Sequence, residues 1–351
     1  MQERYQYSAL LDFAIALGQK VGLPPDRART QAEILIEADL MGHTTHGLNL
    51  LPNYLRDIES LAMNTTGDPT VVVDRGATVV WDGNSLPGTF LVSLALTDAI
   101  QRVAQHGVVT FVIRRGGHIG ALISYLRRAT EQGCIMLLMT TNPLARTVVP
   151  AGGIDPVLAP NPVAFGCPTD GDPILIDIST SAVANGSVRR WAAEKKHLPE
   201  DWLQDSDGNL TRDPEALFRS PPGALLPLGG VELGHKGFAL GLIVEILTGG
   251  LSGLGHTGAP AEAGNLVYFQ IIDPDAFVGR SVFKTDTDNL ADACRASRAR
   301  SKSAAVRMPG DRALELRRTQ LSTGIELHPS ILPNLGQWAN KLGVALPPRE
   351  A

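Results

Sequence analysis

Apolar residues recur at helical spacing over the first part of the chain. Leu10, Ala14 and Leu17 stand three or four positions apart, and residues 7–62 as a whole keep this spacing, which predicts a series of helices. A second helix is expected to begin at residues 24–26 (PPD), because proline and acidic residues are typical of a first helical turn. The N-terminal part of the chain is therefore expected to be helical.

A third helix is expected after residues 42–47 (GHTTHG). Thr45 is interpreted as its N-cap, with apolar positions continuing from Leu48 to Ile58. This assignment places His46 in the first turn, beside free backbone N–H groups. Because the positive end of a helix disfavours a charged imidazole, the pKa of His46 is expected to be low.

The middle of the chain is rich in short apolar and β-branched runs bounded by glycine or polar residues, a pattern typical of strands. Strands are expected at residues 71–73, 78–81, 108–115, 135–141, 162–168, 174–178 and 266–272. Helices are expected at residues 91–106 and 121–132, and a buried helix at residues 238–247. Residues 197–232 are rich in Pro, Gly and Asp and are expected to leave the core, and helix returns after about residue 300. The mixture predicts an α/β protein.

Composition narrows the class of protein. A chain of 351 residues can bury a large core and is expected to hold two or three subdomains. The net charge of −5 argues against a nucleic-acid-binding surface. The one basic cluster is interpreted as a solvated helix face and comprises Arg295, Arg298, Arg300 and Lys302.

Cysteine usage and hydropathy indicate a reducing, aqueous compartment. Cys134, Cys167 and Cys294 are odd in number and far apart, so neither a disulfide framework nor a zinc site is expected. Cys134 and Cys167 lie in apolar runs and are expected to be buried. The N-terminus does not resemble a signal peptide, and no run of about 18 apolar residues predicts a membrane span. A cytoplasmic location is expected.

Residues 253–258 (GLGHTG) match the dinucleotide-binding pattern G-x-G-x-x-G letter for letter. That pattern needs a strand before it and a helix after it, because the glycines let a helix N-terminus approach the pyrophosphate. Here the expected helix at residues 238–247 comes first and residues 259–261 (APA) follow. The segment is interpreted as the end of a helix followed by a loop, and not as a Rossmann fingerprint.

Four segments combine titratable or hydroxyl side chains with glycine, or place them at the end of a strand. Such positions allow backbone donors and proton-transfer groups to meet a ligand. Their wide spacing suggests an enzyme site assembled from distant pieces. The segments are residues 42–47 (GHTTHG), 116–120 (GGHIG), 174–181 (ILIDISTS) and 234–240 (GHKGFAL).

Each segment offers one candidate for chemistry and one plainer interpretation. His46 and His118 are candidate proton donors or acceptors, since imidazole titrates near neutral pH, but either could be a structural hydrogen-bonding residue. Asp177 could orient a catalytic histidine or merely cap the next turn. Lys236 could contact a phosphate at a helix start, or face solvent. His43 is interpreted as a structural neighbour.

Together the four segments resemble the malate/L-lactate dehydrogenase family that lacks a Rossmann domain, which includes ureidoglycolate, sulfolactate and diketogulonate dehydrogenases and piperideine/pyrroline-2-carboxylate reductases. The resemblance runs from residues 38–43 (ADLMGH), through residues 198–202 (LPEDW) and the dipeptide at 207–208 (DG), to residues 307–310 (RMPG). It implies a mostly antiparallel, non-Rossmann cofactor-binding sheet, a helical domain formed by both termini, and a homodimer.

The resemblance also implies a division of the chain and an activity. Residues 1–75, completed by 300–351, would form the helical domain, residues 76–130 a small α/β substrate and dimer segment, and residues 131–299 the cofactor-binding domain. The activity would be NAD- or NADP-dependent hydride transfer to a 2-keto acid or cyclic imine carboxylate, or from the matching 2-hydroxy acid. Partners would be a small-molecule substrate and a second copy, with no metal, nucleic acid or membrane.

The resemblance carries specific residues over to this chain. His46, His118 and Asp177 would be catalytic, with the matching histidine of the ureidoglycolate branch acting as proton acceptor at His118. Thr45, which stands for the family's serine, would bind substrate with His46. The cofactor would be held by His118, Ile119, Gly120, Asp177, Ile178, Ser179, Thr180, His235, Lys236, Gly237 and Arg307.

The chain departs from the family at one position. Most members carry an arginine four residues after the motif histidine, gripping the substrate carboxylate, and here that residue is Leu50. Leucine cannot replace an ionic hydrogen bond, so either another cation such as Arg146 takes the role or the substrate differs. Leu50 is expected to face the substrate. The departure keeps two alternatives open, a non-catalytic ligand-binding relative and a lyase or isomerase that uses the histidine pair without nicotinamide.

Overall fold

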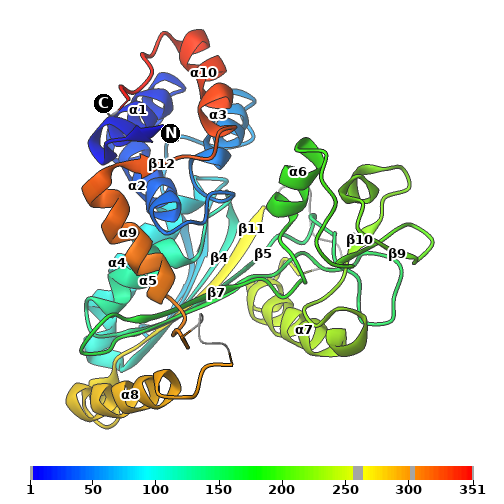
Figure 1. Ribbon diagram of the computed structural model, residues 1–351. Helices are drawn as coiled ribbons and strands as arrows, with labels where there is room; N and C mark the ends of the chain where they lie inside the picture. The colour runs from blue at the N-terminus through cyan, green and yellow to red at the C-terminus, as the bar shows by residue number, and fades with distance from the viewer. Residues whose placement is uncertain (1–2, 256–263, 301–304, 350–351) are drawn as a thin grey trace.

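A computed structural model describes residues 3–255, 264–300 and 305–349 (Figure 1). The helices are α1 Tyr7–Lys20, α2 Pro25–Leu40, α3 Leu51–Glu59, α4 Gly88–His106, α5 Ile123–Thr130, α6 Asn185–Ala193, α7 Gly230–Glu245, α8 Arg280–Arg295, α9 Asp311–Thr323 and α10 Ile331–Leu342. The strands are β1 Arg4–Tyr5, β2 Thr70–Asp74, β3 Thr78–Asp82, β4 Val108–Gly116, β5 Ile135–Thr141, β6 Val163–Cys167, β7 Ile174–Ile178, β8 Leu203–Gln204, β9 Leu210–Thr211, β10 Ala224–Leu225, β11 Asn265–Ile272 and β12 Ile325–Glu326.

A mixed seven-stranded sheet forms the centre of the molecule, in the order β2-β3-β4-β11-β5-β6-β7. The pair β3–β4 is parallel, and the other neighbouring pairs are antiparallel. β11, which comes late in the chain, lies between β4 and β5 and pairs with both. The division expected at residue 130/131 therefore runs through one continuous sheet.

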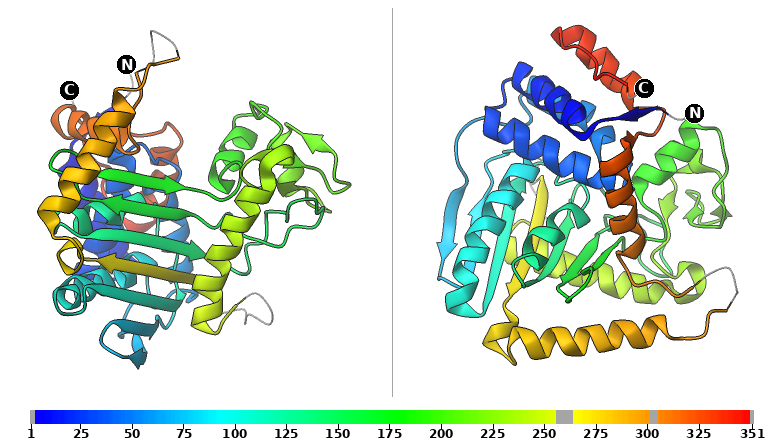
Figure 2. Two further views of the ribbon diagram at one scale, coloured as in Figure 1. Left: turned by 90° about the horizontal axis from the view of Figure 1, so that it is seen from below. Right: turned by 60° about the vertical axis from the view of Figure 1, so that its left-hand side comes forward.

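The main core lies between one face of this sheet and the helices α2, α4 and α5. Phe111 of β4 and Phe269 of β11 stack with ring centroids 5.2 Å apart, and Trp81 meets Phe111 edge-on. On the opposite face, α7 packs through Val244 against β-strand residues that include Tyr268. α7 and α8 both cross this opposite face (Figure 2).

The two ends of the chain pack together. β1 pairs with β12, and residues from α1, α2, α3 and α10 share one hydrophobic core in which Leu10, Leu35 and Leu335 are fully buried. In Figure 1 these blue and red helices form one layer above the sheet. Residues 183–228 form a lobe on the other side, with a small sheet in the order β10-β8-β9. Val148 and Leu158, from the segment before β6, share the hydrophobic cluster of this lobe.

The strands expected from the sequence are confirmed within one or two residues, and the burial of Cys134 and Cys167 is confirmed. The helix expected at residues 238–247 is present as part of α7 and the π-helix Ile246–Gly250, but the expectation that it is buried is wrong. α7 begins at Gly230 and leaves much of its apolar surface exposed, including Leu242 and Ile243 at 39% and 47%. The reason is that α7 buries mainly small residues, so its larger apolar side chains point outward.

Three other expectations need correction or a limit. The segment at residues 197–232 lies outside the main core as expected, but it forms the paired strands β8, β9 and β10 and buries Leu203 and Leu225 in a smaller cluster. The basic cluster is not one helix face, since α8 ends at Arg295 and Lys302 lies outside the described residues. A π-helix, Ile246–Gly250, extends α7 up to the glycine-rich segment at residues 253–258, of which 256–258 lie outside the described residues. A helix, not a strand, therefore precedes that segment.

Candidate active site

The first motif begins at the C-terminal end of α2. Gly42 has a φ of +83°, a left-handed conformation that glycine adopts without steric cost. Its N–H donates to the Asp39 carbonyl at 3.0 Å, and the His43 N–H donates to the Ala38 carbonyl at 2.8 Å. These two bonds form a Schellman motif, which ends the helix and turns the chain toward the sheet. The glycine at position 42 therefore sets the direction in which the histidines leave α2.

A buried carboxyl group fixes the rest of this turn. Asp39 is fully buried, and its Oδ2 accepts a hydrogen bond from the Leu48 N–H at 2.7 Å. Gly47 packs directly on the carboxyl, since a Cβ at position 47 would lie 2.3 Å from the Asp39 Cγ. Burial raises the pKa of Asp39 to about 7. The contacts of the Asp39 carboxyl with Gly47 and Leu48 thus fix the C-terminal end of the turn between Gly42 and Gly47.

His46 lies in this turn and not in a helix. The 3₁₀ helix η1 runs from Leu48 to Leu50 with Gly47 as its N-cap, so the assignment of Thr45 as N-cap is wrong. The Thr45 Oγ1 instead lies 2.9 Å from the His46 Nδ1. Burial lowers the pKa of His46, Asp177 opposes this shift, and His43 and Arg190 add to it. The direction expected from the sequence is confirmed, but its main cause is desolvation and not a helix end.

His118 lies in the second motif, between β4 and α5. Its Nδ1 accepts the Gly120 N–H at 3.1 Å and lies 2.8 Å from the Tyr54 hydroxyl. A backbone N–H can only donate, so Nδ1 carries a lone pair and, in the neutral ring, Nε2 carries the proton. Desolvation lowers the pKa of His118, and His46 lowers it further, although the residue as a whole keeps an exposed surface. The geometry therefore favours a neutral His118 that donates a hydrogen bond through Nε2.

The third motif brings a carboxylate to the two histidines. The His46 and His118 rings stack with centroids 6.0 Å apart. Asp177, in β7, accepts the Ile123 N–H at 2.9 Å and lies 4.0 Å from the His43 Nδ1. Asp177 thus caps α5 and not the turn after β7, and its charge also acts on the histidine group.

These groups line a cavity of about 540 Å³, a size usual for small-molecule sites. The described lining comes from the first three motifs, the ends of β5 and β6, and the start of α6. Asp177 and Arg190 are its only carboxylate and its only Arg or Lys side chain. The lining residues are Gly42, His43, Thr44, Thr45, His46, His118, Gly120, Ala121, Leu122, Thr140, Thr141, Asn142, Ala145, Ala159, Pro160, Asn161, Pro162, Asp177, Ser179, Ala184, Asn185, Gly186, Ser187, Arg190 and Asn265.

The contribution of α6 is not evident from the sequence. The Arg190 Nη1 donates to the Thr44 Oγ1 at 3.0 Å, which links α6 to the first motif. The Arg190 Nη2 and the Asn185 Oδ1 are buried without a hydrogen-bond partner among the described residues. The only signal in the sequence is a pair of arginines on a short helix, which usually indicates a solvated face.

The fourth motif lies beside the cavity but does not line it. His235 and Lys236 are exposed within the second turn of α7, and so they do not precede a helix. The Leu228 N–H donates to the Thr180 carbonyl at 2.8 Å, and the Gly237 N–H donates to the Leu228 carbonyl at 3.2 Å. The third and fourth motifs are therefore joined through Leu228.

Several other candidates lie away from the cavity. Leu50 is half-buried, packs against the core formed by both ends of the chain, and is not among the described residues that line the cavity. Arg146, Ile178 and Arg307 are exposed and outside the described lining, and Ile119 is buried in the main core.

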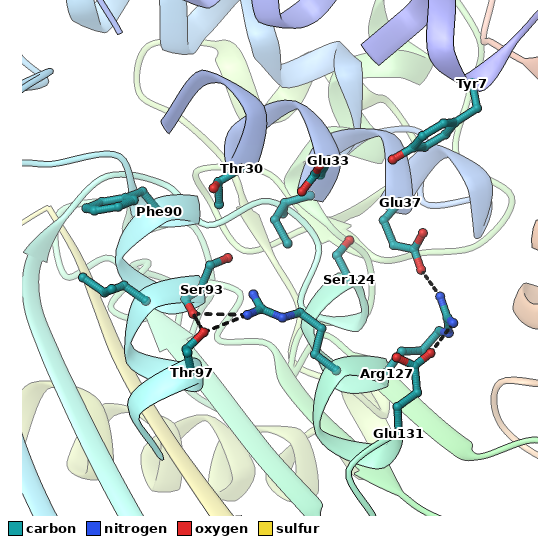
Figure 3. Close-up of a pocket in the computed structure, with 13 residues that line it drawn as sticks. Tyr7, Thr30, Glu33, Glu37, Phe90, Ser93, Thr97, Ser124, Arg127 and Glu131 are labelled. Carbon is teal, nitrogen blue, oxygen red and sulfur yellow. Dashed lines mark hydrogen bonds and ion pairs between the residues drawn. The ribbon is translucent and has the colours of Figure 1, made fainter. Parts of the chain in front are cut away.

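A second cavity, of about 570 Å³, lies between α2, α4 and α5 (Figure 3). Its charged groups largely pair with one another. Arg127 bonds to Glu37 at 2.8 Å and also to Glu131, and Arg128 bonds to the Thr97 hydroxyl at 3.0 Å. It contains no histidine, so the first cavity is the better candidate for proton transfer.

The described residues offer neither a membrane-spanning helix nor a cluster of metal-ligating side chains. No helix among them is long and apolar enough to cross a membrane. No group of three or more His, Cys, Asp or Glu side chains in that part of the chain could hold a metal ion.

Comparison with known proteins gives full-length matches. A model of the malate/L-lactate dehydrogenase family matches residues 5–336. The L-lactate dehydrogenase of Cupriavidus necator is 34% identical over 93% of this chain and 94% of its own length. The solved malate dehydrogenase of Pyrococcus horikoshii OT3 is 29% identical with a TM-score of 0.87, covering 98% of this chain and 99% of that one. The delta1-piperideine-2-carboxylate reductase of Pseudomonas syringae pvar. tomato is 30% identical with a TM-score of 0.79, covering 96% and 100%.

The contact between Gly47 and Asp39 leads to a prediction. Gly47→Ala is expected to destabilise the protein by roughly 1–3 kcal/mol, the usual cost of overpacking, because the new Cβ overlaps the buried carboxyl. Urea unfolding measures this, with Gly336→Ala as control, since a Cβ there meets its nearest atom at 4.0 Å. Adding Asp39→Ala should recover part of the loss relative to the sum of the single changes. Strictly additive effects would show that the two residues do not interact.

Proposed function

Because this chain belongs to the malate/L-lactate dehydrogenase family and is an oxidoreductase of hydroxy and keto acids, we propose that its first cavity carries out nicotinamide-dependent hydride transfer. The observation that carries the proposal is the pairing of His46 and His118, whose ring centroids lie 6.0 Å apart, in a cavity whose described lining has one carboxylate. The two alternatives left open by the sequence, a non-catalytic relative and a lyase or isomerase, are not retained. The matched relatives are dehydrogenases and a reductase.

His46 is proposed as the acid and base. A bound nicotinamide supplies hydride to a carbonyl or imine carbon, or accepts it in the reverse direction. During reduction the substrate oxygen or nitrogen gains a proton, and His46 gives it. During oxidation His46 takes the proton of the hydroxyl group. In the proposed tautomer Thr45 accepts the His46 Nδ1–H, which leaves Nε2 to exchange the proton with substrate.

His118 and Asp177 are proposed to support this transfer. His118 donates through Nε2–H to the substrate oxygen and stabilises the charge that develops there. Asp177 raises the pKa of His46 against the effect of burial, and so favours the imidazolium that forms during oxidation. His118 is therefore assigned as a neutral donor here, and not as the proton acceptor that the family resemblance implies.

The residues of the cavity fit a nicotinamide. Small apolar residues, Ala121, Ala145 and Ala159, leave room for a flat ring, and hydroxyl and amide groups stand at its edge. The unpartnered Asn185 Oδ1 could accept a hydrogen bond from a carboxamide N–H. This chemistry supports a nicotinamide cofactor, either NAD or NADP, without a Rossmann fingerprint.

The remaining cofactor contacts are proposed from the family resemblance. Outside the cavity, the cofactor would follow the segments that join the third and fourth motifs through Leu228. The mixed sheet would then act as a non-Rossmann cofactor-binding sheet. The proposed contacts are His118, Ile119, Gly120, Asp177, Ile178, Ser179, Thr180, His235, Lys236, Gly237 and Arg307.

A cytoplasmic homodimer is proposed as the working form. Support for the dimer comes from α7, whose exposed apolar side chains exceed what a monomer usually leaves to solvent on one helix. They are Val231, Leu233, Leu240, Leu242 and Ile243, and Ile246 at the start of the π-helix adds to them. The proposed helical domain, residues 1–75 with 300–351, keeps both termini together in each copy. Sedimentation equilibrium that detects only monomer at micromolar concentration would exclude the dimer.

The role of His46 can be tested directly. His46→Ala is expected to lower kcat for 2-keto acid reduction by about 10²–10⁴-fold, the usual contribution of an acid–base group, while NADH affinity changes only a few-fold. Stopped-flow turnover and quenching of protein fluorescence by NADH measure the two effects. His106→Ala, at the exposed end of α4, is the control. Near-normal kcat in His46→Ala would remove this residue from the mechanism.

The pH profile should reflect the lowered pKa of His46. Oxidation needs the unprotonated ring, so its kcat/KM should rise with pH and level off above an apparent pKa below 6.5. Reduction needs the protonated ring, so its kcat/KM should fall with rising pH through the same value. Asp177→Asn removes the charge that opposes burial and should move both profiles to lower pH. Profiles that His46→Ala leaves unmoved would assign the titration to another group.

A further inference from the structure

A keto or hydroxy acid brings a carboxylate into a cavity in which Asp177, the one carboxylate among the described lining residues, repels it. Burying that carboxylate is unfavourable unless a cation or several donors meet it. Leu50, at the position where most relatives carry an arginine, packs in the terminal core and supplies neither. Arg146 and Lys236 are exposed and lie outside the described lining.

We propose that Arg190 of α6 binds the substrate carboxylate, and that the enzyme therefore selects monocarboxylic 2-keto or 2-hydroxy acids over dicarboxylic ones. The proposal rests on the proposed function. It assigns to α6 a task that the first motif, which α6 contacts through Arg190 and Thr44, does not perform.

The helix presents Arg190 to the cavity. Gly186, Ser187 and Arg190 line the cavity. Gly186 and Ser187 stand four and three residues before Arg190, so both lie on the same face of α6 as Arg190. Arg189 belongs to another face, is exposed, and lies over the Phe218 ring at 5.3 Å. The two neighbouring arginines thus have different surroundings, which makes Arg189 a matched control.

The Arg190 guanidinium has an N–H donor group that is not used in the described structure. Nη1 donates to Thr44, and Nη2 is buried without a partner among the described residues. A guanidinium presents five N–H groups in a planar fork, which matches the two oxygens of a carboxylate. A rotation of the side chain toward the cavity brings Nη2 to a bound carboxylate and relieves the cost of the unpaired donor.

The positive charge of Arg190 is not cancelled by an ion pair within the described chain. The two acidic groups that act on it are Glu194 and Asp39. Glu194 is engaged by Lys196 at 2.7 Å and His328 at 3.4 Å, and the Asp39 Oδ2 accepts the Leu48 N–H. Arg190 is therefore available to an anion that enters from the cavity.

The position of Arg190 also relates the carboxylate to the chemistry. Thr44, its hydrogen-bond partner, stands two residues before His46 in the turn held by Asp39. A carboxylate on Arg190 is thus anchored beside the group proposed to move the proton. In a 2-keto acid the carboxylate and the reacting carbonyl are on adjacent carbons, so one anchor positions both.

The charged residues of the described lining, Asp177 and Arg190, also define the substrate class. A second carboxylate, as in oxaloacetate, would find no second Arg or Lys in the described lining and would lie near Asp177. Apolar lining residues, Ala121, Leu122 and Ala145, suit a short apolar side chain instead. Pyruvate and its aliphatic homologues fit this description.

The experiment compares Arg190→Gln, Arg190→Lys and the control Arg189→Gln with the wild-type enzyme. In Arg190→Gln the KM for pyruvate should rise roughly 10- to 100-fold, the fold-change expected for losing an ionic hydrogen bond, while the KM for pyruvamide, which lacks the charge, changes little. Arg190→Lys should recover part of the loss, and Arg189→Gln should match the wild type. Calorimetric binding of oxamate to the enzyme–NADH complex provides a readout that does not depend on turnover.

Each outcome decides one question. An unchanged ratio of pyruvate to pyruvamide KM in Arg190→Gln, with oxamate affinity retained, overturns the role of Arg190 and leaves the proposed function standing. A wild-type kcat/KM for oxaloacetate equal to or above that for pyruvate overturns the substrate class. A wild-type enzyme that neither binds NADH nor reduces any 2-keto acid overturns the proposed function itself. If Arg190→Gln fails to fold, as thermal melting would show, the comparison of Arg190→Lys with the wild type decides.

Discussion

The hydrogen bond from the Leu48 N–H to the buried Asp39 carboxyl is the constraint on which the rest of the site depends. This hydrogen bond closes the turn that carries His43 and His46. It also requires glycine at position 47, where no side chain fits. The Gln320 side chain of α9 donates to the Asp39 and Leu40 carbonyls at 3.0 and 2.9 Å, so the C-terminal part of the chain holds the same turn. The packing of the two termini is thereby part of how the site is built.

Burial, more than helix ends, sets the electrostatics of this site. It lowers the pKa of His46 and of His118 and raises that of Asp39, so each group is driven toward its neutral form. Asp177 acts in the opposite direction on His46. Neutral groups favour proton exchange at moderate pH. Among them Arg190, the one Arg or Lys of the described lining, interacts more strongly with an anion than it would in water.

The sequence predicted the parts of the structure that depend on local pattern. Apolar and β-branched runs located β3, β4, β5 and β11, and three of the glycine-bearing or strand-end motifs meet at one cavity. It could not predict that β11 inserts between β4 and β5, because strand order is set by long-range pairing. It also misplaced Thr45, since the Thr-His-Gly pattern of a capped helix also fits a turn that begins with a Schellman motif.

Arg190 shows why part of the site was out of reach of pattern analysis. On a short helix with two adjacent arginines, spacing alone cannot tell which one faces a cavity that other segments complete. The distinction appears only when Gly186 is seen against Thr45, where a Cβ would lie 3.2 Å from the threonine Cβ, and Arg190 against Thr44. Glu194, one turn further, reaches His328 near the C-terminus. The contacts of α6 thus cross from the lobe to the layer formed by both termini. A carboxylate anchor on this helix is set by the same contacts that place it over the histidine turn, so binding specificity and the alignment of the proton donor depend on one interface.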